Sequence, residues 1–143
     1  MDQPASPPPP LGAVLETALY VEDLGRARGF YEDVLGLQPM FEDGRVAAYP
    51  VGASVFLLFQ QGTTTTPAKL PGGTIPAHGA NGSIHYAFAI APSNLEAWRE
   101  HLHGHRVAIE GEVAWPRGGH SLYFRDPDGH LLELATPGIW SNY

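Results

Sequence analysis

The sequence predicts an α+β fold in which two βαβββ units form an open, curled mixed sheet around a cavity. Two observations support this prediction. The order strand, helix, then about three strands occurs twice along the chain, which is an internal repeat at low sequence identity. In addition, polar residues in several strands share one face with small residues, as they do where a sheet lines a cavity. With 143 residues, 43% of them hydrophobic, the chain is long enough for one domain with a sizeable core.

The first unit is expected over residues 13–62. Val14 to Val21 is strand-like, and the pattern then changes to helical spacing, with Gly36 ending the helix. The apolar positions that share one helical face are Leu24, Ala27, Phe30 or Tyr31, and Val34. Residues 42–60 follow as short strands, broken at Asp43-Gly44 and again at residues 50–52.

The second unit is expected over residues 82–137. Residues 83–93 have a strand pattern, and residues 94–105 a helical one in which Leu95, Trp98 and Leu102 share a face. Ser93 or Asn94 is the expected N-cap of this helix. Three further strands complete the unit, and the Asp-Pro-Asp-Gly turn at 126–129 joins the last two.

The remaining segments have the composition of tails and connections. Residues 1–12 hold a run of prolines and are expected to be a disordered tail, and residues 138–143 form a C-terminal tail. Residues 63–81 are rich in Thr, Pro and Gly and show no periodicity. A loop of this length is either a plain linker or a lid over a site.

Composition excludes several classes of function. The net charge is −7 and the eight Lys and Arg residues are scattered, so there is no basic patch for nucleic acid. Cysteine is absent, so a metal would have to bind to His, Asp or Glu. Without an apolar run of membrane-spanning length or a signal-peptide pattern, the expected protein is soluble and cytoplasmic, with no membrane partner.

One face of the predicted sheet carries the polar chemistry. Glu16 alternates with apolar residues at the start of the first strand, and an unpartnered buried carboxylate costs several kcal/mol, so Glu16 is expected to face a partner. By the same alternation His85, Glu133, Ser121 and Tyr123 point to the side opposite the helices. Two carboxylates and an imidazole from three strands suit a divalent cation and leave coordination positions open.

Each of these residues also has an ordinary interpretation. A single Glu or His in a strand is more often exposed or simply hydrogen-bonded than a metal ligand, and the residues alone leave both readings open. Trp115 and Arg117 precede a Gly-Gly pair and line either the cavity rim or an ordinary strand connection. Five other histidines fit helix-end, turn or linker positions: His78, His101, His103, His105 and His130.

Two segments, "LYVEDLGRARGFYEDVLGL" at 19–37 and "YFRDPDGHLLELATPG" at 123–138, resemble the vicinal oxygen chelate superfamily. That superfamily includes glyoxalase I, extradiol dioxygenases, fosfomycin-resistance transferases and bleomycin-resistance proteins. The resemblance implies a glyoxalase-like fold in which paired modules hold a divalent metal, with Glu16, His85 and Glu133 as ligands. The metal is expected to be Zn, Ni, Mn or Fe.

Departures from the family pattern narrow the expected reaction. The fourth ligand of glyoxalase I falls near Leu57, which cannot coordinate, and Glu16 replaces the first His of the extradiol dioxygenases. The three ligands look most like those of the fosfomycin-resistance transferases, where Tyr123 matches a tyrosine that contacts the phosphonate. Ala18, however, replaces a substrate-contacting Thr.

The expected protein is therefore a metalloenzyme acting on a small oxygen-chelating substrate by lyase, isomerase or transferase chemistry, and not glyoxalase I proper. Tyr123 and Glu133 would be catalytic, and Tyr123, Ser121, Trp115 and Arg117 would bind substrate. The alternative is a metal-free drug-binding protein like those of bleomycin resistance. The family also implies a homodimer, in which the linker permits modules of two chains to share a site.

Overall fold

A computed structural model describes residues 6–143, and its first half is a βαβββ module with one helix. In chain order its elements are β1 (Glu16–Val21), α1 (Leu24–Asp33), β2 (Phe41–Glu42), β3 (Val46–Val51) and β4 (Ser54–Gln60). The sheet order is β1-β4-β3-β2. Strands β1 and β4 are parallel, and the other pairs are antiparallel.

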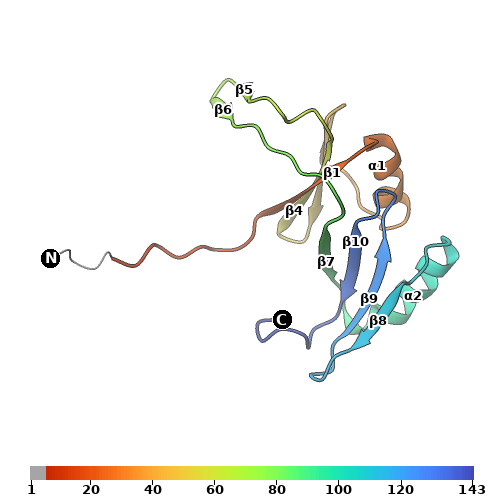
Figure 1. The fold of residues 1–143 in the computed structure, drawn as a ribbon. Coiled ribbons are helices and arrows are strands. Elements are labelled where there is room, and N and C mark those ends of the chain that lie inside the picture. Colours follow the sequence, from red (N-terminus) through yellow and green to blue (C-terminus); the bar gives the residue numbers. More distant parts are fainter. Residues whose placement is uncertain (1–5) are drawn as a thin grey trace.

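The second half repeats this arrangement. Its elements are β7 (His85–Ala89), the short 3-10 turn η1 (Pro92–Asn94), α2 (Leu95–Gly104), β8 (Gly111–Ala114), β9 (His120–Arg125) and β10 (Leu131–Ala135). The sheet order is β7-β10-β9-β8, with β7 parallel to β10. The predicted fold class is confirmed: two α+β modules with mixed sheets, which do not close into a barrel (Figure 1).

Helix α1 follows the sequence prediction closely. The Asp23 side chain accepts a hydrogen bond from the backbone N–H of Arg26 at 3.0 Å and caps the helix. The predicted apolar face is buried at Leu24, Ala27, Tyr31 and Val34. Gly36, with φ of +72°, allows the chain to turn away after the helix in a conformation that favours glycine.

The start of α2 differs from the prediction, because neither Ser93 nor Asn94 caps it with a side chain. Pro92 opens the turn η1, which leads directly into the helix. Asn94 therefore already has helical dihedral angles, φ −101° and ψ 0°. A side-chain cap needs a residue with an extended backbone at this position. Because the turn η1 leads directly into α2, Asn94 does not have that backbone and cannot cap the helix.

The segment between the modules contains a small hairpin that its sequence did not predict. Strands β5 (Ala68–Leu70) and β6 (Gly73–Ile75) pair antiparallel. The hairpin base is closed by Thr64 and His78, since the His78 N–H donates to the Thr64 carbonyl at 2.9 Å and the Thr64 hydroxyl to the His78 carbonyl at 2.6 Å. Strands of three residues are too short to give a readable alternation, which is why the sequence showed no pattern here.

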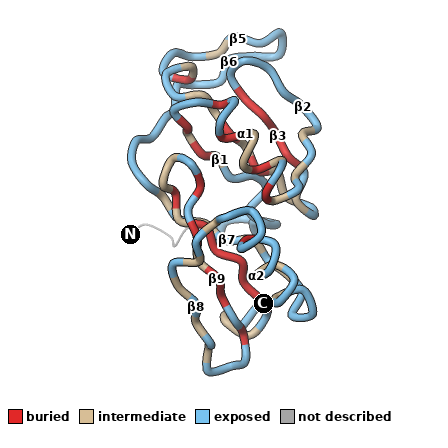
Figure 2. Tube along the Cα trace, turned by 90° about the vertical axis from the view of Figure 1, so that its right-hand side faces the viewer, coloured by how far each residue is buried: buried red, intermediate tan, exposed pale blue. Residues whose placement is uncertain are grey.

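The two modules share one core on the helix-facing sides of their sheets. Tyr86 donates to the Tyr31 hydroxyl, and Tyr31 donates to Asp126 Oδ2, both at 2.7 Å. Phe56 of the first sheet stacks on Tyr86 of the second, with ring centroids 5.1 Å apart. Figure 2 shows buried positions along the strands of both modules. The shared core leaves the opposite face of each sheet available for other contacts.

His130 connects the two modules through the backbone. It is buried, and its Nδ1 accepts a hydrogen bond from the Ile84 N–H at 3.1 Å. Its Nε2 lies 3.3 Å from the Tyr20 carbonyl oxygen, to which it donates. Both nitrogens are therefore satisfied by structural contacts.

The chain segment before β1 is extended and exposed over residues 6–15, while the rest of the proline-rich tail, residues 1–5, lies outside the described residues. Across residues 6–143, none of the helices has the length and apolar character needed to cross a bilayer.

Candidate metal centre

The register of the second sheet gathers four of the predicted site residues on one face. Strand β10 lies between β7 and β9, and Glu133 is aligned with Ala87 on one side and Tyr123 on the other. His85 is aligned with Leu131, two positions before Glu133. Alternation along the strands then places His85, Glu133, Tyr123 and Ser121 on the side of the sheet away from α2.

His85 and Glu133 form the central pair of this group. His85 Nδ1 lies 2.9 Å from the Leu131 carbonyl oxygen, which can only accept, so Nδ1 carries a proton. The other nitrogen, Nε2, lies 3.2 Å from Glu133 Oε1. In the neutral imidazole, Nε2 presents a lone pair beside a carboxylate oxygen. That arrangement is the one expected of two neighbouring metal ligands, with a backbone carbonyl orienting the imidazole.

Ser121 and Trp115 hold the carboxylate of Glu133 in place. Glu133 is only 7% exposed, and Ser121 is fully buried. The Ser121 hydroxyl donates to Glu133 Oε2 and accepts from Trp115 Nε1 at 2.9 Å. Oε2 is thereby fixed, and Oε1 is directed toward His85.

Tyr123 lies beside this pair, with its ring centroid 6.1 Å from that of His85. Burial, together with the negative charge of Glu133, raises the pKa of the Tyr123 hydroxyl above its ordinary value. The phenol therefore keeps its proton at neutral pH and acts as a hydrogen-bond donor.

The C-terminal segment forms one wall of the cavity that His85 and Glu133 line, which has a volume of about 320 Å³. Ile139, Trp140 and Tyr143 contribute to this wall. The sequence predicted only a tail here, because the segment has no periodicity. The backbones of Gly138 and Gly119 approach closely and hold this segment, because a Cβ on Gly138 would come within 2.5 Å of the Gly119 nitrogen. The glycines at these two positions were the only sign in the sequence that the segment packs here.

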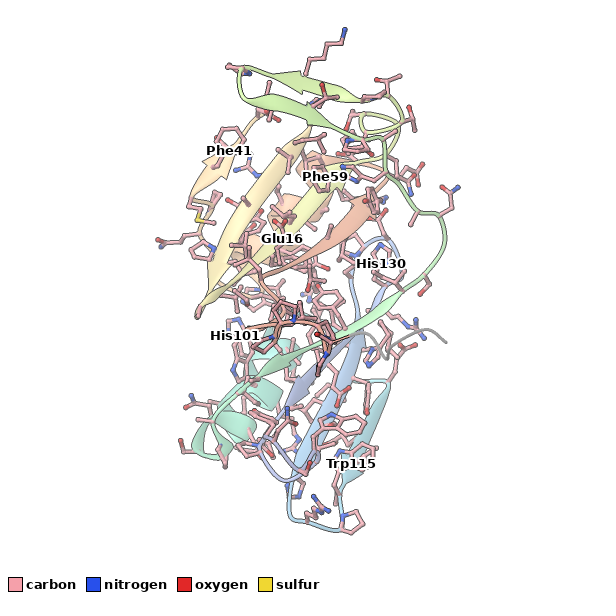
Figure 3. The ribbon with its side chains drawn as sticks, turned by 90° about the vertical axis from the view of Figure 1, so that its left-hand side faces the viewer. Glu16, Phe41, Phe59, His101, Trp115 and His130 are labelled. Carbon is pink, nitrogen blue, oxygen red and sulfur yellow. The ribbon has the colours of Figure 1, made fainter. Side chains whose placement is uncertain are left out.

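Glu16 is exposed, so it is not the buried carboxylate that the strand pattern predicted, and it lines a different cavity beside the first sheet. That cavity has a volume of about 550 Å³, and Ala18, Leu57 and His78 also line it. Figure 3 shows Glu16 on the first sheet and Trp115 at the far end of the second module. Within residues 6–143 of a single chain, no group of three or more His, Asp or Glu side chains is placed to hold a metal ion.

Two other predicted positions have different outcomes. Trp115 contacts the site through Ser121, as described above. Arg117 is exposed in the turn between β8 and β9, and its side chain has no hydrogen bond or ion pair with any residue from 6 to 143. His78, which the sequence placed in the linker, contacts the Tyr20 hydroxyl and packs edge-on against Phe59 at 5.0 Å between centroids.

A sequence profile of the Glyoxalase/Bleomycin resistance protein/Dioxygenase superfamily matches residues 13–134. The chain belongs to this superfamily. Among relatives, it is 31% identical to the metallothiol transferase FosB of Staphylococcus saprophyticus over 118 residues, covering 81% of this chain and 71% of that protein. FosB of Shouchella clausii is 29% identical over 124 residues, covering 81% and 74%.

Solved structures of the superfamily share the fold. A structure of lactoylglutathione lyase from Agrobacterium tumefaciens superposes with a TM-score of 0.84 at 32% identity, covering 93% of this chain and 99% of that one. The fosfomycin-resistance protein FosX of Listeria monocytogenes superposes with a TM-score of 0.63 at 18% identity, covering 88% and 93%. The second likeness concerns the fold alone.

Proposed function

We propose that the protein is a metal-dependent enzyme acting on a small oxygen-chelating substrate by transferase-type chemistry. The observation that carries the proposal is the pairing of His85 Nε2 with Glu133 Oε1 at 3.2 Å, with Nδ1 held by a backbone carbonyl. The donor set of imidazole and carboxylate suits Zn, Ni, Mn or Fe. The FosB relatives, named as metallothiol transferases, support a transferase.

The third ligand of the proposed site is Glu16 of a second chain. Glu16 and the His85–Glu133 pair line separate cavities of one chain, so a shared site needs another copy. Val14 and Leu15, next to Glu16, are 77% and 68% exposed. Strands β1 and β7 are also at sheet edges, which natural proteins usually cover. A homodimer in which the first module of one chain faces the second module of its partner would cover these surfaces and complete two sites.

The bound metal would act as a Lewis acid on a substrate oxygen. The residues of this chain would supply the rest. Tyr123 keeps its proton and donates it in a hydrogen bond to a second substrate oxygen, which orients the substrate. Ser121 and Trp115 hold the Glu133 carboxylate in one orientation, and Ile139, Trp140 and Tyr143 would line the substrate cavity. Leu57 has no coordinating atom, so the site differs from that of glyoxalase I.

Metal analysis tests this proposal. Protein purified without a chelator or a metal-binding tag should hold about one divalent ion per chain, and His85→Ala should lose it while keeping the wild-type fold. His103→Ala is the matched control, because His103 is exposed on α2, outside both cavities. Metal-free wild-type protein that cannot be loaded would reject the enzyme and favour a drug-binding protein. Undiminished metal in His85→Ala would remove His85 from the ligand set.

A further inference from the structure

The first module has a large apolar cavity beside Glu16, which we call the bay. Its volume is about 550 Å³, within the range of pockets that bind whole small molecules. Glu16, the proposed third ligand, lines this cavity as well. The floor consists of Ala18, Ala48, Leu57 and Phe59.

The floor of the bay owes its depth to small residues in adjacent strands. Leu57 is aligned with Ala18 on one side and Ala48 on the other, so a single Leu lies between two alanines. Glu16 is two residues before Ala18 on the same face of β1, about 7 Å away along the strand. The bay is therefore continuous with the position of Glu16.

The segment between the modules covers part of the bay with both apolar and polar groups. Ala68, Ile75 and Pro76 line the cavity from this side, and Thr64 and His78 close the hairpin base as described above. Figure 3 shows Glu16, Phe41 and Phe59 on the sheet below the hairpin. Thr63, Thr64, Thr66 and His78 line the cavity from this side as well, so the cover is mixed. The apolar floor favours a ligand with an apolar face, since burial of that face is stabilising.

Arg45 is the one Lys or Arg among the described residues that line the bay. Four other arginines pair with carboxylates: Arg26, Arg28, Arg99 and Arg125. The Arg45 side chain has no hydrogen bond or ion pair with any residue in 6–143, although Asp43 holds its backbone N–H at 2.7 Å. Arg45 is exposed and lines the cavity, so in a chain of net charge −7 its guanidinium donors are available to a ligand.

The position of Arg45 is far from that of Glu16. Glu16 is aligned with Val55, whereas the Arg45 carbonyl accepts from the Gln60 N–H. Five positions along β4 separate these points, a distance of about 17 Å. An anion bound by Arg45 is therefore a different group from the oxygens that would chelate a metal near Glu16.

We propose that the bay selects substrates with an apolar body and a separate acidic group, and that Arg45 is the residue that recognises this group. The proposal rests on the proposed function for the chelating end of the substrate. The apolar body lies on Ala18, Leu57 and Ala48, and the carboxylate, sulfonate or phosphate accepts hydrogen bonds from the Arg45 guanidinium. Arg45 is in this sense a determinant of specificity.

Two fluorescent probes with the same ring system test the proposal without a known substrate. Anilinonaphthalene sulfonate carries an acidic group, and phenylnaphthylamine does not. Wild-type protein should bind both, and Arg45→Gln should weaken binding of the sulfonate about tenfold, the effect of losing one charge-assisted interaction. Binding of the neutral probe should stay within about twofold, because the apolar surface is unchanged. Arg106→Gln, which removes an exposed arginine outside the bay, should leave both affinities unchanged.

A substitution that fills the bay supplies the second arm. Ala48→Phe should weaken binding of both probes, and circular dichroism with thermal unfolding verifies that it folds. Equal sulfonate affinity in the wild type and Arg45→Gln, an equal loss in Arg106→Gln, or absence of probe binding to the wild type would each overturn the proposal. Metal content, measured on the same proteins, should be unaffected by Arg45→Gln. If the protein holds no metal but still prefers the sulfonate probe in an Arg45-dependent way, the proposed enzyme is rejected and the proposed role of Arg45 stands.

Discussion

A metal-binding site shared between two chains can be tested by combining two inactive variants. Glu16 and His85 line separate cavities, of about 550 and 320 Å³, in a single chain. Glu16→Ala removes the proposed ligand from the first module, and His85→Ala removes one from the second. Each homodimer then has two defective sites, and we expect both variants to hold little metal when prepared separately.

The expected recovery follows from the geometry of an exchanged dimer. In a heterodimer of the two variants, one site has lost both Glu16 and His85, while the other pairs an intact first module with an intact second module. Random exchange of equal amounts makes about half of the dimers heterodimers. About one site in four is then intact, so metal content should rise to about one quarter of the wild-type value.

The assay combines native mass spectrometry, which verifies exchange, with elemental analysis of the mixed sample. Glu16→Ala mixed with Glu110→Ala is the control, because Glu110 is exposed and pairs with Arg125 outside both cavities. In that mixture every heterodimer has one intact site and every Glu110→Ala homodimer has two. The metal content of the mixture should therefore equal the mean of the unmixed Glu16→Ala and Glu110→Ala proteins, with no gain on exchange. Verified exchange of Glu16→Ala with His85→Ala and no gain in metal would place all ligands within one chain. A monomer by light scattering would reject the shared site outright.

Two further predictions concern the hydrogen bonds of the buried polar groups. Ser121→Ala removes the hydroxyl that contacts Glu133 Oε2 and Trp115 Nε1, and should weaken metal affinity about 10- to 100-fold in chelator competition. The control Ser54→Ala, which loses only a turn contact, should keep the wild-type affinity. Equal metal affinities for Ser121→Ala and the wild type would show that Ser121 does not orient the carboxylate. Burial raises the pKa of Tyr31 far above its ordinary value, so above about pH 10 the folded state keeps a proton that the unfolded state releases. The contribution of Tyr31 to the free energy of unfolding is therefore constant below about pH 10 and declines above it. Tyr31→Phe should lower the free energy of unfolding at pH 7 by about 2 kcal/mol and reduce this alkaline decline in urea titrations, and an unchanged pH dependence would contradict the assignment.

Strand alternation alone was enough to group part of the proposed site. It placed His85, Glu133, Ser121 and Tyr123 on one face of the second sheet, and the register of β7, β10 and β9 has them there. The repeated order of elements likewise determined the two-module fold. These features are readable because the twofold period of a strand and the 3.6-residue period of a helix act locally.

The tertiary structure decided how the two polar faces lie relative to each other. The helix-facing sides of both sheets meet in one core, joined by Tyr86, Tyr31 and Asp126, and this packing leaves Glu16 in a separate cavity from His85. The same folding brought Trp140 to the wall of one cavity and His78 to the other. Such contacts join residues far apart in the sequence through packing and hydrogen bonds, for which local periodicity carries no information.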